Sequence, residues 1–126
     1  MFTIAVRRHF VARHFLIGGD WGCENEKHSH SYALEVRLEG PNLNEHGYLM
    51  DIVEIDNLLA GIMARLSNRL LNELPEFAGL NPSIERLAEQ CCRWLIDGLK
   101  NPPISAVNVK VFENDDAWAS CRREIP

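Results

Sequence analysis

Residues 28–40, HSHSYALEVRLEG, alternate between two kinds of side chain. The positions that share one parity are mostly aromatic or aliphatic, namely His28, His30, Tyr32, Leu34, Val36 and Leu38. Because successive side chains of a strand point to opposite faces, this alternation predicts a β-strand with one buried face. Both histidines lie on that face, and Gly40-Pro41-Asn42 ends the strand.

The same alternation occurs upstream, in residues 2–14. One parity holds Phe2, Ile4, Val6, Phe10, Ala12 and His14. Three glycines between positions 18 and 22 then predict a loop, so we expect the two strands to pair as an antiparallel hairpin. His14, which ends the first strand, is therefore expected close to the start of the second.

In residues 51–72, the apolar side chains recur at intervals of three and four positions instead of two. This period predicts an amphipathic helix of about six turns, with Asp51 as its N-cap. A second amphipathic helix is predicted over residues 84–99, with Asn81 or Ser83 as its cap. It is stopped by the signals Gly98, Asn101, Pro102 and Pro103.

Alternation returns in residues 107–113, and residues 117–124 can form a short fourth strand. The resulting order is strand, strand, helix, helix, strand, strand. It predicts an α+β fold, in which two helices lie on one face of a four-stranded antiparallel sheet.

Size and charge exclude several classes of protein. A chain of 126 residues suits a single domain. The 13 basic against 18 acidic side chains, a net charge of −5, argue against nucleic acid as a partner. No apolar run approaches the roughly 20 residues of a membrane span, and the N-terminus lacks the features of a signal peptide. We therefore expect a cytoplasmic protein, in which the cysteines are reduced.

Three histidines are the strongest chemical signal. His28 and His30 leave the same face of one strand, and His14 has the buried parity of the neighbouring strand. Three imidazoles without a fourth protein ligand are typical of a catalytic zinc site. The alternative is a polar strand start without a metal, which a His-x-His pair alone would favour.

Two further side chains have open interpretations. Cys23 lies in a glycine-containing loop five residues before His28, where a nearby metal cation would activate its thiol; the alternative is an incidental loop cysteine. Glu113 continues the inward parity of the third strand, so its carboxylate must be paired. That partner is either an amidine-like ligand edge or a structural salt bridge.

Six short motifs follow one another along the chain, within a resemblance that extends from about residue 2 to residue 121. They are Ala12-Arg13-His14, Cys23, His28-Ser29-His30-Ser31-Tyr32, Gly47-Tyr48-Leu49-Met50-Asp51, Asn81-Pro82-Ser83-Ile84-Glu85 and Val111-Phe112-Glu113. Together they resemble the family of 6-pyruvoyl-tetrahydropterin synthase and 6-carboxytetrahydropterin synthase. The resemblance implies one domain over residues 1–126 with the tunnelling fold, in which subunits pool their sheets into a barrel. It also implies a homo-hexamer built from two trimeric rings.

The resemblance further implies a role for each site residue. His14, His28 and His30 match the zinc ligands, Cys23 the catalytic cysteine, and Glu113 the residue that anchors the pterin. The short chain is most similar to the branch that converts 7,8-dihydroneopterin triphosphate to 6-carboxytetrahydropterin, acetaldehyde and triphosphate. That branch serves 7-deazaguanine and queuosine biosynthesis.

One motif departs from the family pattern. Where the family has an Asp-His pair near the end of the long helix, this chain has Ser67-Asn68, and neither side chain exchanges a proton near neutral pH. Two hypotheses follow. The chain is either a zinc-dependent 6-carboxytetrahydropterin synthase or a pterin- and zinc-binding paralogue that acts as a carrier or regulator.

Overall fold

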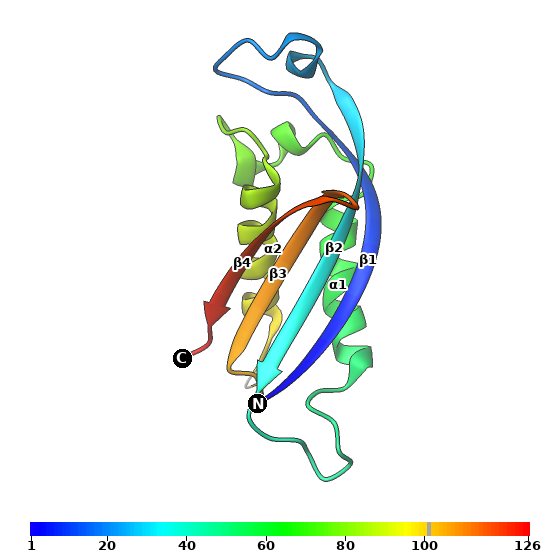
Figure 1. Ribbon diagram of the computed structural model, residues 1–126, viewed down its shortest axis with the longest axis vertical. Helices are drawn as coiled ribbons and strands as arrows, with labels where there is room; N and C mark the ends of the chain where they lie inside the picture. Colours follow the sequence, from blue (N-terminus) through cyan, green and yellow to red (C-terminus); the bar gives the residue numbers. More distant parts are fainter. Residues whose placement is uncertain (101) are drawn as a thin grey trace.

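The computed structural model describes residues 1–100 and 102–126. Its sheet has the strand order β1-β2-β3-β4, and every neighbouring pair is antiparallel. The strands are β1 (Phe2–His14), β2 (His28–Gly40), β3 (Ala106–Asn114) and β4 (Ala117–Glu124). Two helices, α1 (Ile52–Leu66) and α2 (Ile84–Gly98), cover one face of the sheet (Figure 1). The predicted α+β class and element order are confirmed.

The β1–β2 hairpin has an uninterrupted register. Its ladder runs from Phe2 opposite Gly40 to His14 opposite His28. The loop between the strands projects from one end of the molecule, and the loop after β2 lies at the other end (Figure 1). The predicted hairpin is therefore confirmed, and with it the proximity of His14 to the start of β2.

Both helices begin at side-chain caps. Asp51 Oδ1 accepts a hydrogen bond from Val53 N at 2.9 Å, and Ser83 Oγ accepts one from Arg86 N at 3.2 Å. Asp51 is thus the predicted cap of α1, and Ser83 rather than Asn81 caps α2. Three short 3-10 helices complete the secondary structure: η1 (Gly22–Asn25), η2 (Leu71–Glu73) and η3 (Pro75–Phe77).

The long helix is shorter than predicted, because it ends at Leu66 instead of continuing to residue 72. Asn68 adopts a left-handed conformation with φ of 60°, and its N–H donates to the Val11 carbonyl at 2.7 Å. The chain therefore leaves the helix and runs along the outer edge of β1. Apolar spacing continues past the helix end because this segment still packs on the core, where Leu70 is buried.

The second helix ends one residue before the predicted boundary, at Gly98. The Leu99 N–H closes the last turn with a hydrogen bond to the Leu95 carbonyl at 3.0 Å. Asn101, one of the predicted stop signals, lies outside the described residues. Neither α1 nor α2, the α-helices of the described chain, combines the length and apolar character that a membrane crossing requires.

The hydrophobic core lies between the sheet and the two helices. Its largest fully buried side chains are Tyr32, Phe77, Leu34, Leu38, Ile55, Leu59, Leu66, Leu71, Leu87 and Leu95. On the opposite face of the sheet, Glu35 accepts hydrogen bonds from Arg7 at 3.1 Å and from Arg37 at 2.9 Å. The sheet thus separates an apolar layer from a charged surface.

Candidate metal centre and adjoining pocket

Three histidine rings meet where β1 ends and β2 begins. The ring centroid of His14 lies 4.4 Å from that of His28 and 4.7 Å from that of His30, and the latter two are 4.8 Å apart. Each residue offers one ring nitrogen within 4.8 Å of the others. The hairpin register produces this cluster, because His14 pairs with His28 and His30 follows two residues later on the same face.

The hydrogen bonding of His28 leaves one ring nitrogen free. Its Nδ1 lies 2.8 Å from the Glu26 carbonyl oxygen, which can only accept, so Nδ1 carries the proton and donates. The other nitrogen, Nε2, is buried and has no hydrogen-bond partner in the described structure. A buried lone pair without a partner, on a ring oriented through its other nitrogen, is typical of a metal-ligating histidine.

His14 is held in a similar way, by the hydroxyl of Tyr32 at 2.8 Å from its Nδ1. Its ring is buried, and this burial, followed by the charges of His30 and His28, lowers its pKa to about 4. Since a metal binds the neutral imidazole, His14 is in its ligating form at neutral pH.

These observations fit a bound metal ion. Three imidazoles converge, two are oriented by hydrogen bonds through Nδ1, and one has an unsatisfied buried nitrogen. The three histidines predicted from the sequence are therefore brought together, and they can hold a metal ion.

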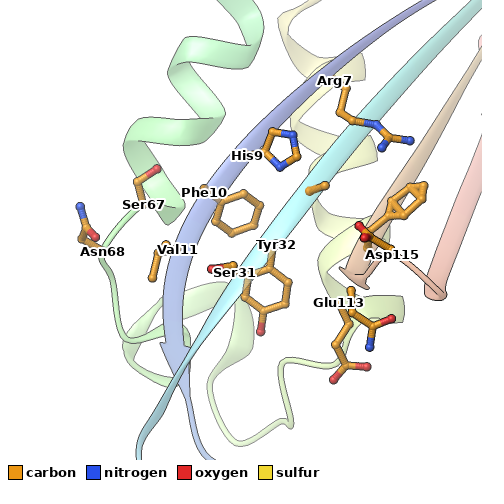
Figure 2. Close-up of a pocket in the computed structure, with 13 residues that line it drawn as sticks. Arg7, His9, Phe10, Val11, Ser31, Tyr32, Ser67, Asn68, Glu113 and Asp115 are labelled. Atoms are coloured by element: carbon orange, nitrogen blue, oxygen red, sulfur yellow. The ribbon is translucent and has the colours of Figure 1, made fainter.

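A pocket of about 950 Å³ adjoins this cluster. Figure 2 shows its lining, which comes from β1, β2, the end of β3 and the segment after α1. The histidines are not among the lining residues, but Tyr32 is, and its hydroxyl bonds to His14. Tyr32 thus connects the pocket to the candidate metal centre. The sequence could have indicated this role, because Tyr32 follows His30 by two residues and so lies on the same face of β2.

Glu113 lines the pocket near the end of β3. The register between β3 and β4 shifts between Phe112 and Asn114, and Glu113 is exposed. The carboxylate that the alternation predicted to be buried is therefore exposed, next to an irregularity in the pairing of β3 with β4. Its negative charge still reaches Tyr32, whose pKa is raised by burial and then by Glu113.

Cys23 lies in the loop between β1 and β2, within η1, and is exposed. It is not part of the cluster of potential metal ligands found in the described residues. Its carbonyl accepts a hydrogen bond from Glu26 N at 3.1 Å, and Glu26 in turn holds His28. The backbone of one residue, Glu26, thus bonds both to the Cys23 carbonyl and to the His28 ring.

Ser67 and Asn68 line the same pocket as Glu113, with β1 between them and the strands β2 and β3 (Figure 2). They follow α1 rather than belonging to it, since Ser67 is the residue that closes the helix. The chain thus presents a hydroxyl and an amide to the pocket at this position, and neither group exchanges a proton near neutral pH.

The fold and the histidine cluster define an α+β protein with a candidate metal centre beside a pocket. The family model described as 6-pyruvoyl tetrahydropterin synthase matches residues 3–124. The chain belongs to this family.

Two relatives with assigned names are similar along the sequence. A protein of Archaeoglobus fulgidus, provisionally named 6-carboxy-5,6,7,8-tetrahydropterin synthase, is 28% identical over 120 residues, which cover 95% of each chain. The dihydroneopterin monophosphate aldolase of Pyrococcus furiosus is 32% identical over 85 residues, 68% of this chain and 67% of that one.

The fold has a solved counterpart. The 6-pyruvoyl tetrahydropterin synthase of Caenorhabditis elegans superposes with a TM-score of 0.85, covering 98% of this chain and 96% of that chain at 19% identity. The predicted family and fold are therefore confirmed. The relatives with assigned names are pterin enzymes, although their names give different reactions.

Proposed function

We propose that this chain is a zinc-dependent 6-carboxy-5,6,7,8-tetrahydropterin synthase. It would convert 7,8-dihydroneopterin triphosphate to 6-carboxytetrahydropterin, acetaldehyde and triphosphate, as a step of 7-deazaguanine and queuosine biosynthesis. The observation that carries the proposal is the histidine cluster joined through Tyr32 to a pocket that contains Glu113. The similarity to the Archaeoglobus fulgidus protein along 95% of the chain supports the choice of reaction.

The chain's own residues would bind the metal, bind the pterin and transfer the proton. His14, His28 and His30 would hold zinc, which when bound supplies Lewis-acid polarisation of the substrate's side-chain oxygens. The exposed carboxylate of Glu113 would accept two hydrogen bonds from the N–H edge of the pterin, a geometry that favours amidine-like groups. Cys23 would take and return a proton at the side-chain carbon, as a general base and acid.

The site would be completed by oligomerisation. β1 and β4 are the outer strands of the sheet, and unpaired strand edges favour association with another chain. We propose that residues 1–126 act as one domain and that copies pool their sheets in a homo-hexamer of two trimeric rings. Light scattering at micromolar concentration tests this assembly, and a monomeric mass would contradict it.

One observation favours a second candidate. Because Ser67 and Asn68 offer no proton exchange at the pocket, the chain can also be a carrier or regulator that binds zinc and pterin without turnover. Both functions require the histidines and Glu113. The synthase would convert the bound pterin chemically, whereas the carrier or regulator would leave it unaltered.

The test is incubation of the zinc-loaded protein with 7,8-dihydroneopterin triphosphate, and separately with the monophosphate, followed by mass analysis of the products. A 6-carboxytetrahydropterin product that Cys23→Ala abolishes would support the synthase, with Cys121→Ser as the matched cysteine control. Cleavage of the monophosphate alone would indicate the aldolase reaction named for the Pyrococcus furiosus relative. Stoichiometric binding without any product would establish the carrier.

A further inference from the structure

Two asparagine side chains hold the chain where it leaves β1. Asn72 Oδ1 accepts from Phe15 N at 2.9 Å, and its Nδ2 donates to Phe15 O at 2.9 Å. Asn81 repeats the arrangement on Ile17, accepting from N at 2.7 Å and donating to O at 3.1 Å. Each amide therefore satisfies both backbone groups of one residue, as a neighbouring strand would.

The opposite side of the same segment is held by the loop that contains Cys23. Leu16 N donates to the Glu24 carbonyl at 2.9 Å, and Asn25 Nδ2 donates to the Leu16 carbonyl at 3.0 Å. Since residues 15 and 17 bond to one side and residue 16 to the other, the segment is fixed between the two asparagines and η1. The contacts of Asn72 and Asn81 thus continue through residues 15–17 to η1.

The histidines depend much less on these contacts. His14 and His28 close the β1–β2 ladder, which is complete without the asparagine bonds. His28 is oriented by Glu26, and His14 by Tyr32. Loss of the asparagine bonds should therefore release the cysteine loop and leave the metal cluster in place.

We propose that Asn72 and Asn81 are positioning residues, which fix the place of the Cys23 loop relative to the histidine cluster. The inference rests on the proposed function only in assigning Cys23 to that centre. An amide is required at both positions, because a carboxylate keeps the acceptor for the N–H but places a negative oxygen against the carbonyl.

The experiment compares the native protein with the double variant Asn72→Asp/Asn81→Asp. The Asn44→Asp variant is the control, because the Asn44 side chain accepts hydrogen bonds from His46 N and Tyr48 N through Oδ1, which a carboxylate can also do. Its loop lies at the other end of the hairpin (Figure 1). The first readout is the rate of Cys23 alkylation by iodoacetamide with and without zinc, resolved from the other cysteines by peptide mass spectrometry. Bound zinc is measured in the same samples, and amide exchange is measured for residues 15–26.

In the native protein and the control, zinc should change the Cys23 alkylation rate, because a nearby cation alters thiol reactivity. The double variant should bind the same amount of zinc, while its Cys23 rate no longer responds to the metal. Amide exchange in residues 15–17 should be about tenfold faster, since one hydrogen bond per asparagine is lost. Where the native protein has turnover, kcat should fall more than KM changes.

Three results would overturn the inference. If Cys23 of the double variant responds to zinc as in the native protein, the asparagines do not position it, and the proposed function is unaffected. If the variant loses its zinc, the asparagines hold the histidines instead. If zinc does not change the alkylation rate of Cys23 in the native protein, both the positioning role of the asparagines and the catalytic role of Cys23 are wrong. Should the double variant fail to fold, the single variants Asn72→Asp and Asn81→Asp answer the same questions.

Discussion

Acidification of the metal-free protein should destabilise it through His14. Burial beside two other imidazoles lowers its pKa from 6.5 to about 4 in the folded state. Between these two values the unfolded chain binds a proton that the folded chain does not, so stability falls as the pH falls through this window. Between about pH 7.5 and about pH 4.5, the free energy of unfolding should decrease by about 2.5 kcal/mol on account of His14 alone.

Urea titrations of the chelator-treated protein at the two pH values measure this decrease. The His14→Gln variant is the matched control, because glutamine does not titrate but can still hydrogen-bond to the Tyr32 hydroxyl. The variant should show a pH-dependent loss that is smaller by about the calculated amount. An equal loss in both proteins would refute the assignment of this pH dependence to His14.

Three further changes test other parts of the structure. His28→Ala should lose most bound zinc, measured by metal analysis, whereas His46→Ala on an exposed loop should retain it; equal retention would contradict the metal site. Ser67→Asp with Asn68→His should raise the rate of any product formation by up to about 10²-fold in a turnover assay, because the new pair can exchange a proton. An unchanged rate would show that Ser67 and Asn68 do not limit turnover. Asp51→Ala should lower the free energy of unfolding by about 1 kcal/mol in urea titration, because it removes the cap of α1; a change below experimental error would show that the cap contributes nothing.

The regular parts of the fold could be predicted from local pattern. The alternation of the two strands predicted His14 close to His28. It could do so because the register of a hairpin is strongly specified when one of its faces is buried. The caps Asp51 and Ser83 were predictable for a similar reason, since their hydrogen bonds reach only two or three residues along the chain. Local sequence contains all the information that these features need.

The features that were missed depend on contacts between distant segments. The long helix stops at Leu66 because Asn68 bonds to β1, a strand more than fifty residues earlier in the chain. Glu113 is exposed beside a register shift between β3 and β4. Asn81 was one of two residues expected as the cap of α2, but its amide bonds to Ile17, which no local pattern could reveal.

The sheet order has a consequence for how the chain folds. The β1–β2 and β3–β4 hairpins each join neighbours in sequence, whereas β2 and β3 are separated by both helices. Closing this roughly fivefold longer connection costs about 1.4 kcal/mol more chain entropy than closing the β1–β2 loop. We therefore expect the central seam between β2 and β3 to form last, after the helices have packed, and to set the rate at which the chain folds.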